Sequence, residues 1–237
     1  MGLLKEEKTI VTPGEVVAEG MDFLPGDGTM RRGEDIIATM LGLLTLKGRL
    51  LKITPVAGGY LPAKNDMIIG KVVDIIMSGW RVEINSAYSA LLPLRDASNN
   101  FIPRGADLTQ FYTFDDYIAC RISNVTSQNL VDLTMRGPGL RKLTGGRIIE
   151  VSPVKVPRII GKNGSMVSML KRASGCQIVV GQNGLVWVDG EPEKEIVVIE
   201  AVRMIESNAH RSGLTEQVET FLTERLGPIP KEEGEKR

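Results

Sequence analysis

Residues 158–165 read Arg158-Ile159-Ile160-Gly161-Lys162-Asn163-Gly164-Ser165, a Gly-x-x-Gly loop between two apolar segments with helical spacing. Glycine has no Cβ atom, so a phosphate backbone can approach the main chain closely at both glycines. The second glycine opens a helix, whose N–H groups and positive dipole end favour an anion. The lysine and the asparagine between the glycines add a positive charge and amide donors. The loop therefore predicts a phosphate-binding site, although a plain turn between two helices has the same spacing.

The segments around this loop predict the order strand, helix, helix, strand, strand, helix. Asn183-Gly184 is a favoured hairpin turn between the second and third strands. Ile196, Ile199, Val202 and Ile205 are expected on one face of the last helix. The predicted elements are a strand over 147–151, a short helix from Pro153, a helix ending at Ser174-Gly175, strands over 176–182 and 185–189, and a helix over 193–209.

Positive charge is concentrated around the loop. The whole chain is neutral, with 29 basic and 29 acidic residues. Residues 136–172 hold nine basic residues and one acidic residue, a net charge of +8, whereas residues 1–135 carry −3 and residues 173–237 carry −5. Such a local basic region next to the loop is the footprint expected for a phosphate-bearing partner, and a solvated basic linker is the alternative.

This order of elements, with the loop between the first two helices, resembles the KH fold of eukaryotic-type topology. The resemblance covers residues 145–212 and implies binding of single-stranded RNA, because KH loops of this kind clamp about four nucleotides. The residues that it implies for RNA binding are Lys155, Arg158, Gly161, Lys162, Asn163, Gly164, Lys171 and Arg172.

Residues 63–137 predict a small all-β unit with strands over 67–77, 80–84, 87–94, 117–125 and 130–135. Five such strands fit an OB-type barrel. Gly70-Lys71-Val72-Val73-Asp74-Ile75, Gly79-Trp80-Arg81-Val82, Ala90-Leu91-Leu92-Pro93 and residues 130–136 resemble an S1 RNA-binding domain. By this resemblance, Trp80 stacks on a base, a contact worth about 1–3 kcal/mol. Arg81, Arg121 and Arg136 are candidate phosphate contacts, and packing against a neighbouring domain is the alternative for Trp80.

The remaining segments carry no recognisable chemistry. Residues 1–60 predict a β-rich domain with apolar runs over 36–46 and 49–56 and no phosphate-binding or catalytic motif. Residues 96–116 form a long insertion whose aromatic residues contact a partner or build a satellite core. Residues 213–237 are expected to hold a C-terminal helix and a charged, disordered tail.

Composition and motifs argue against an enzyme. His210 is the only histidine and is expected to compensate a helix dipole, so neither a histidine-ligated metal site nor a histidine-based triad is predicted. No Gly-x4-Gly-Lys-Ser/Thr loop is present, and Asp115-Asp116 lacks the further carboxylates that two-metal chemistry needs. Cys120 and Cys176 are expected as buried, reduced thiols. The sequence shows neither an export signal nor an apolar run long enough for a membrane span, and we expect a cytoplasmic protein without cofactors.

The order of an N-terminal β domain, an S1 domain and one KH domain resembles the S1/KH cap subunits of the archaeal exosome. Residues 79–90, 157–166 and 177–188 are particularly similar. The resemblance implies a non-catalytic protein, present in three copies on a hexameric ring of RNase PH-like subunits that degrades RNA from the 3′ end by phosphorolysis. The cap recruits single-stranded RNA, including poly(A)-rich tails, and feeds it to the pore; by the same resemblance the N-terminal domain docks on the ring.

Other functions remain open on the sequence. A NusA-like transcription factor also runs S1 then KH but carries two KH units, and polynucleotide phosphorylase carries KH then S1 behind catalytic domains. A structural scaffold without RNA binding of its own is the alternative from another functional class. The Gly-x-x-Gly loop and its basic surroundings argue against the scaffold.

Overall fold

The computed structural model describes residues 2–100, 102–103, 105–209, 211 and 213–230. The chain divides into two compact units, Met1–Gly58 and Gly59–Arg237, and each is considered by itself. His210, Phe101 and residues 231–237 of the expected tail lie outside the described residues.

The first unit consists of two small antiparallel-rich sheets around one core. One sheet has the strand order β1-β6-β7-β3 and the other β2-β5-β4. The strands are β1 (Ile10–Val11), β2 (Val16–Glu19), β3 (Leu24–Pro25), β4 (Thr29–Arg32), β5 (Asp35–Ala38), β6 (Gly42–Lys47) and β7 (Leu50–Pro55). The single strand expected over 36–46 is two strands, because β5 ends at Ala38 and β6 begins at Gly42. Between them the Thr39 N–H donates to the Gly28 carbonyl (2.9 Å). The core is built from Val11, Val17, Ala18, Ile36, Ala38, Leu44, Leu51 and Ile53.

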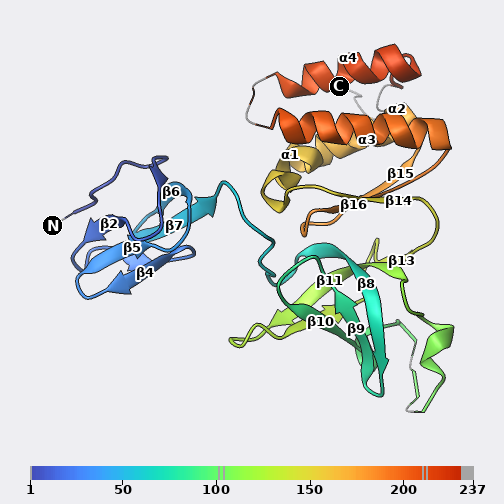
Figure 1. Ribbon diagram of the computed structural model, residues 1–237, viewed down its shortest axis with the longest axis horizontal. Helices are drawn as coiled ribbons and strands as arrows, with labels where there is room; N and C mark the ends of the chain where they lie inside the picture. Colours follow the sequence, from blue (N-terminus) through green and yellow to red (C-terminus); the bar gives the residue numbers. More distant parts are fainter. Residues whose placement is uncertain (1, 101, 104, 210, 212, 231–237) are drawn as a thin grey trace, which may run out of the picture. The chain divides into compact units, whose positions relative to one another are not determined.

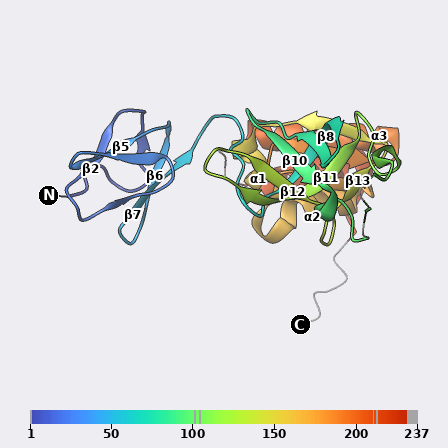
Figure 2. The ribbon, with the colours of Figure 1, turned by 90° about the horizontal axis from the view of Figure 1, so that it is seen from below.

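The second unit begins with a closed five-stranded barrel, as the sequence predicted. Antiparallel pairs join β8 to β9, β9 to β10, β8 to β11 and β11 to β12, and a parallel pair between β10 and β12 closes the barrel. Figure 2 shows β10, β12 and β11 side by side in the view from below. The elements are β8 (Met67–Ile76), β9 (Gly79–Glu83), β10 (Ser89–Pro93), η1 (Leu94–Asp96), η2 (Leu108–Gln110), β11 (Tyr117–Val125), β12 (Val131–Thr134) and β13 (Arg141–Leu143), which extends the sheet at β11.

The KH order that the sequence predicted follows the barrel. A three-stranded antiparallel sheet has the order β14-β16-β15. Figure 1 shows the helices on the face of this sheet that points away from the barrel. The elements are β14 (Arg147–Glu150), η3 (Pro153–Lys155), α1 (Val156–Ile160), η4 (Lys162–Gly164), α2 (Ser165–Ser174), β15 (Gln177–Val180), β16 (Leu185–Asp189), α3 (Pro192–Ser207) and α4 (Leu214–Leu226).

Two of the four residues expected on the core face of α3 lie outside the core. Ile196 is 48 % exposed and Ile199 is half-buried, whereas Val198 and Ala201 are fully buried. Val198, Ala201, Val202 and Ile205 join the core formed with α1, α2 and α4. Ile229 also packs against this core, so the chain just beyond α4 is not a free tail.

The KH sheet is apolar on both faces because both faces are covered. Along β16, Val186 and Val188 enter the core beneath the helices, whereas Leu185 and Trp187 lie in a second cluster with Ile69 and Ala119 of the barrel. Side chains alternate between the two faces of a strand, so one short strand serves both contacts. The barrel therefore packs directly on the sheet face opposite the helices.

Asn183 connects the two parts most closely. Its side chain is fully buried and donates from Nδ2 to the carbonyls of Ile69 (2.7 Å) and Ile84 (2.9 Å), while Oδ1 accepts from the Ile69 N–H (3.2 Å). Asn85 Nδ2 donates in return to the Asn183 carbonyl (3.0 Å). Asn183 is not among the residues with positive φ, and only Gly184 of the expected turn pair is (φ +83°). The asparagine thus satisfies buried backbone groups of the barrel.

Candidate nucleic-acid interface

The Gly-x-x-Gly loop has a backbone that requires its glycines for different reasons. Gly161 has φ +77° and ψ 173°, and a Cβ atom there would lie 2.6 Å from the Met166 N atom. Gly164 has φ +80° and ψ 11°, but a Cβ atom there would meet only Val167 Cγ1 at 3.9 Å. The first glycine therefore permits close packing onto the start of α2, and the second permits a left-handed conformation.

Between the glycines the two polar side chains are free to meet a ligand. Lys162 and Asn163 are both exposed, and Asn163 adopts the left-handed region with φ +53°, which asparagine tolerates. Gly164 is the N-cap of α2 and no side chain caps this helix end. The positive end of the α2 dipole therefore lies at the loop, beside the Lys162 charge.

A hollow of about 310 Å³ adjoins this loop. It brings together Arg158 from the last turn of α1, Gly161 and Lys162 from the loop, and Ser165 from α2. Its other wall is Arg211 and the start of α4, which the sequence pattern does not connect with the loop. The α3–α4 connection comes close to the loop only through tertiary packing. In the sequence, only Arg211 and Gly213 ahead of the last helix could have pointed to it.

The remaining basic residues of the predicted set do not line this hollow. Lys155 is half-buried at the start of α1. Lys171 and Arg172 lie in the last turn of α2, about 10 Å from the loop at 1.5 Å per residue, where cations compensate the negative end of the helix dipole. The KH surface is therefore basic at both ends of α2, with the loop at one end only.

Trp80 lies in the core of the barrel, which corrects the expectation that it stacks on a base. Its side chain is fully buried, and Nε1 donates to the Tyr112 carbonyl (3.0 Å). The rings of Tyr112 and Phe111 contact it edge-on, with centroids at 5.2 and 6.3 Å. The insertion over 96–116 thus covers Trp80 and excludes a base from its face.

The two arginines of the barrel have different surroundings. Arg81 lies on β9 with its guanidinium 3.7 Å from the Asp74 carboxylate, so part of its charge is compensated. Arg136 follows β12, and its Nε donates to the Ser98 carbonyl (3.1 Å). This bond fixes one side of the guanidinium and leaves the other side toward solvent.

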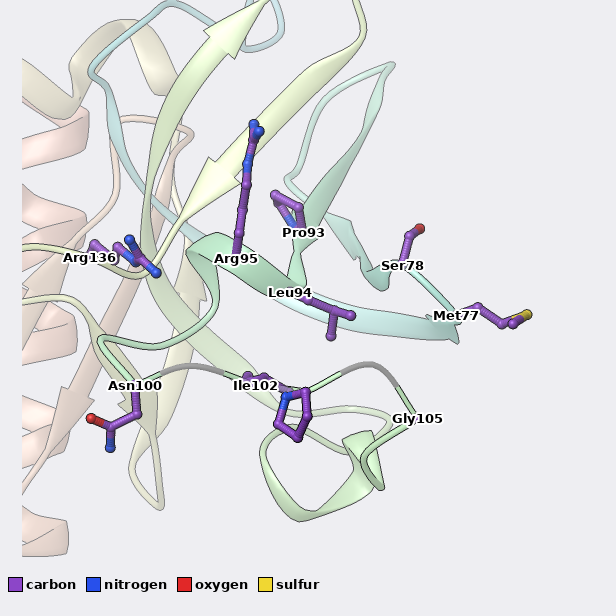
Figure 3. A pocket seen from close by; sticks show the side chains of 10 residues that line it. Met77, Ser78, Pro93, Leu94, Arg95, Asn100, Ile102, Gly105 and Arg136 are labelled. Carbon is purple, nitrogen blue, oxygen red and sulfur yellow. The ribbon is translucent and has the colours of Figure 1, made fainter.

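Arg136 lines a second hollow, of about 900 Å³, at one end of the barrel. Figure 3 shows Leu94 and Ile102 lying across from each other in it, with Arg136 and Met77 on opposite sides. The Arg95 side chain extends away from Ile102 in the same view and pairs with Asp96 (2.9 Å). The lining is mainly apolar, with the arginines at its edge.

The adjacent acids and the cysteines have structural surroundings. Asp115 pairs with Lys71 (2.8 Å) and Asp116 with Lys142 (2.5 Å). Burial disfavours the charged form of Asp116, but hydrogen bonds from Lys142 and Thr113 outweigh it and hold the pKa of the carboxyl below its ordinary value.

Cys120 and Cys176 are buried, unpaired thiols, as predicted, and burial raises the pKa of Cys120. Within the described residues no group of His, Cys, Asp or Glu is arranged to hold a metal, and no helix is long and apolar enough to cross a membrane.

Comparisons with known proteins agree with the fold. A model of the KH domain family matches residues 146–194. Exosome complex component Rrp4 of Methanobrevibacter smithii is 39 % identical over 229 residues, covering 96 % of this chain and 76 % of the relative. The Rrp4 proteins of Methanothermus fervidus and Thermococcus kodakarensis are 40 % and 38 % identical, over 93 % and 96 % of this chain and 97 % and 89 % of the relatives.

One solved structure extends the agreement to three dimensions. A crystal structure described as an exosome complex RNA-binding protein superposes with a TM-score of 0.63 at 32 % sequence identity. The match covers 71 % of this chain and 97 % of the other chain.

Proposed function

The chain belongs to the family of the archaeal exosome component Rrp4, and from this premise we propose that it is the non-catalytic RNA-binding cap of an exosome. It recruits single-stranded RNA, including poly(A)-rich tails, and delivers the strand to the pore of a hexameric phosphorolytic ring for 3′–5′ degradation. Three copies sit on a ring of RNase PH-like subunits in the cytoplasm.

The observation that carries RNA binding is the geometry of the Gly161–Gly164 loop. It presents Lys162 and Asn163 to solvent at the uncapped start of α2, in a segment, residues 136–172, that carries a net charge of +8. Phosphate groups bind where backbone N–H groups, a helix dipole and a lysine converge. The KH loop is therefore the principal RNA contact, and Arg158 supports it from α1.

The barrel contributes less to affinity in this proposal. Trp80 is unavailable for stacking, Arg81 is paired with Asp74, and Arg136 remains as a phosphate contact at the barrel end. Arg121 is half-buried on β11. The barrel thus guides a strand that the KH loop holds.

The first unit carries exposed apolar side chains that contact with the ring would cover. Ile10 on β1, Met21 and Leu24 near β3 are 60 %, 71 % and 56 % exposed. We assign residues 1–60 to contact with the ring subunits.

The RNA contact is tested by reversing the charge of the loop with Lys162→Asp and Asn163→Asp in one protein. The chain offers a matched control in Lys64-Asn65, an exposed pair in which the asparagine is also left-handed (φ +73°). We expect the loop variant to lose affinity for a labelled oligoadenylate in fluorescence anisotropy, while Lys64→Asp with Asn65→Asp retains it. If both variants lose affinity equally, the binding depends on overall charge and not on the loop. If the loop variant keeps its affinity, the KH loop does not contact the RNA.

The assembly is tested by mass spectrometry of the proteins that co-purify with the chain after nuclease treatment. RNase PH-like subunits in the purified complex are the expected result. Recovery of RNA polymerase instead would favour the NusA-like alternative. Recovery of the chain alone would contradict the proposed assembly with a ring.

A further inference from the structure

The hollow beside the Gly161–Gly164 loop has a wall that the KH module itself does not provide. The match to the KH family ends at residue 194, whereas Arg211, Gly213, Leu214 and Thr215 line the hollow from the connection to α4. α4 packs on the core beneath α2 and α3 through Leu214, Val218 and Leu222, so its start is held in place next to the loop.

Three cations from three segments converge on this hollow. Arg158 comes from α1, Lys162 from the loop and Arg211 from the connection that precedes α4. No acidic residue lines the hollow, and among the residues that the structure describes none of the three side chains forms an ion pair with a carboxylate. Like charges held together without counter-charges raise the local potential and favour an anion.

Two helices also begin at the hollow, and neither start is capped by a side chain. Gly164 precedes α2 and Gly213 precedes α4, which have 10 and 13 residues. The acid in the first turn of α4, Glu216, lines a different hollow with Glu219 and Glu224, so its charge is not directed at the three cations. The dipoles of both helices therefore add to the positive potential.

We propose that Arg211 and the start of α4 complete, with Arg158 and Lys162, a pocket for a backbone phosphate of single-stranded RNA. The proposal rests on the RNA-binding function above and adds α4 to the RNA-binding surface. A volume of about 310 Å³ accommodates a phosphate with part of its ribose, and the loop that forms one wall is the same one that meets the strand. The phosphate bridges the KH module and the C-terminal helix.

The first experiment measures the affinity of full-length Arg211→Gln for labelled oligoadenylate over a range of salt concentrations. Loss of one ion contact of this exposed kind is expected to lower affinity about fivefold. It also makes the slope of log affinity against log salt shallower by about 0.7, the value for one phosphate on a single strand. Arg225→Gln is the matched control, since Arg225 lies at the far end of α4 and pairs with Glu200 (2.6 Å).

A second variant separates lost binding from lost folding. Thr215→Asp puts an anion into the hollow but also at the positive end of α4, where it stabilises the helix. We expect weaker RNA binding with an unchanged or higher thermal midpoint. Thr220→Asp adds the same charge on α4 away from this hollow and is expected to retain affinity.

The outcomes distinguish this inference from the proposed function. If the Lys162 and Asn163 variant loses binding while Arg211→Gln and Thr215→Asp keep the wild-type affinity and salt slope, the α4 pocket is overturned and the KH contact stands. If Thr215→Asp and Thr220→Asp lose affinity equally, the effect is general repulsion and the pocket is overturned. If the wild-type chain does not bind the oligonucleotide, both proposals fall.

Discussion

Trp80 packs inside the barrel, although the resemblance to S1 domains implied that it stacks on a base. Trp80 lies on the same inward face of the chain as Val82 and Ile84, the insertion over 96–116 folds over it, and its Nε1 donates to the Tyr112 carbonyl. That cover depends on contacts between residues about 30 apart in sequence, which neither periodicity nor turn chemistry reveals. The sequence left open whether Trp80 stacks on a base or packs against a neighbouring domain. In the structure it packs against the insertion of its own barrel instead.

Replacement of Trp80 by alanine tests this role. A buried aromatic truncated to alanine costs about 3–5 kcal/mol of stability through lost packing and the cavity left behind. Urea unfolding of Trp80→Ala is expected to show a loss of that size, with the RNA affinity of the folded fraction unchanged. Phe114→Ala is the control, because Phe114 is 60 % exposed in the same insertion. A near-neutral effect on stability combined with weaker RNA binding would place Trp80 on the RNA surface after all.

At the scale of elements, the KH loop was predictable because its chemistry is local. The glycine spacing, the helix signals on both sides and the basic surroundings are all within about 20 residues of Gly161. The strands over 117–125 and 185–189 were predicted with the observed bounds because segments rich in β-branched and aromatic residues lie between turn residues there. β1 and β3 have two residues each, too few for any periodicity, and they were not predicted.

The two glycines of the loop are expected to respond differently to alanine. At Gly164 the cost is that of a left-handed residue, about 1–2 kcal/mol, because the space around it is open. At Gly161 the Cβ atom would also collide with Met166 at 2.6 Å and 2.7 Å, so α2 must shift and the loss is larger. Thermal unfolding of both variants measures the difference. Equal losses would mean that the loop relaxes freely and that the contact with α2 does not constrain it.

At the scale of the molecule, the KH loop and the barrel belong to one compact unit. The barrel covers the sheet face opposite the KH helices through Trp187, Ile69, Ala119 and Leu143, and Trp187 Nε1 donates to the Gly145 carbonyl (2.9 Å). The sequence of the KH part predicts apolar strands, but it does not show that both faces of the β14-β16-β15 sheet are covered. The buried asparagine, which has the sequence signature of a turn, is the residue that fixes the two parts together.

This coupling predicts a single cooperative unfolding transition for residues 59–230, and Asn183→Asp is the change that should break it. An aspartate cannot donate to the Ile69 and Ile84 carbonyls and would bring a negative charge against them in a buried site. Unsatisfied buried groups cost about 1–3 kcal/mol each, so calorimetry should show a lower midpoint and separate transitions for the barrel and the KH part. Asn129→Asp, at an exposed turn with φ +59°, is the matched control and should leave one transition. If Asn183→Asp unfolds in one transition at the wild-type midpoint, the hydrogen bonds of Asn183 are not what joins the two parts, and the apolar contact of Trp187 with Ile69 and Ala119 would have to hold them alone.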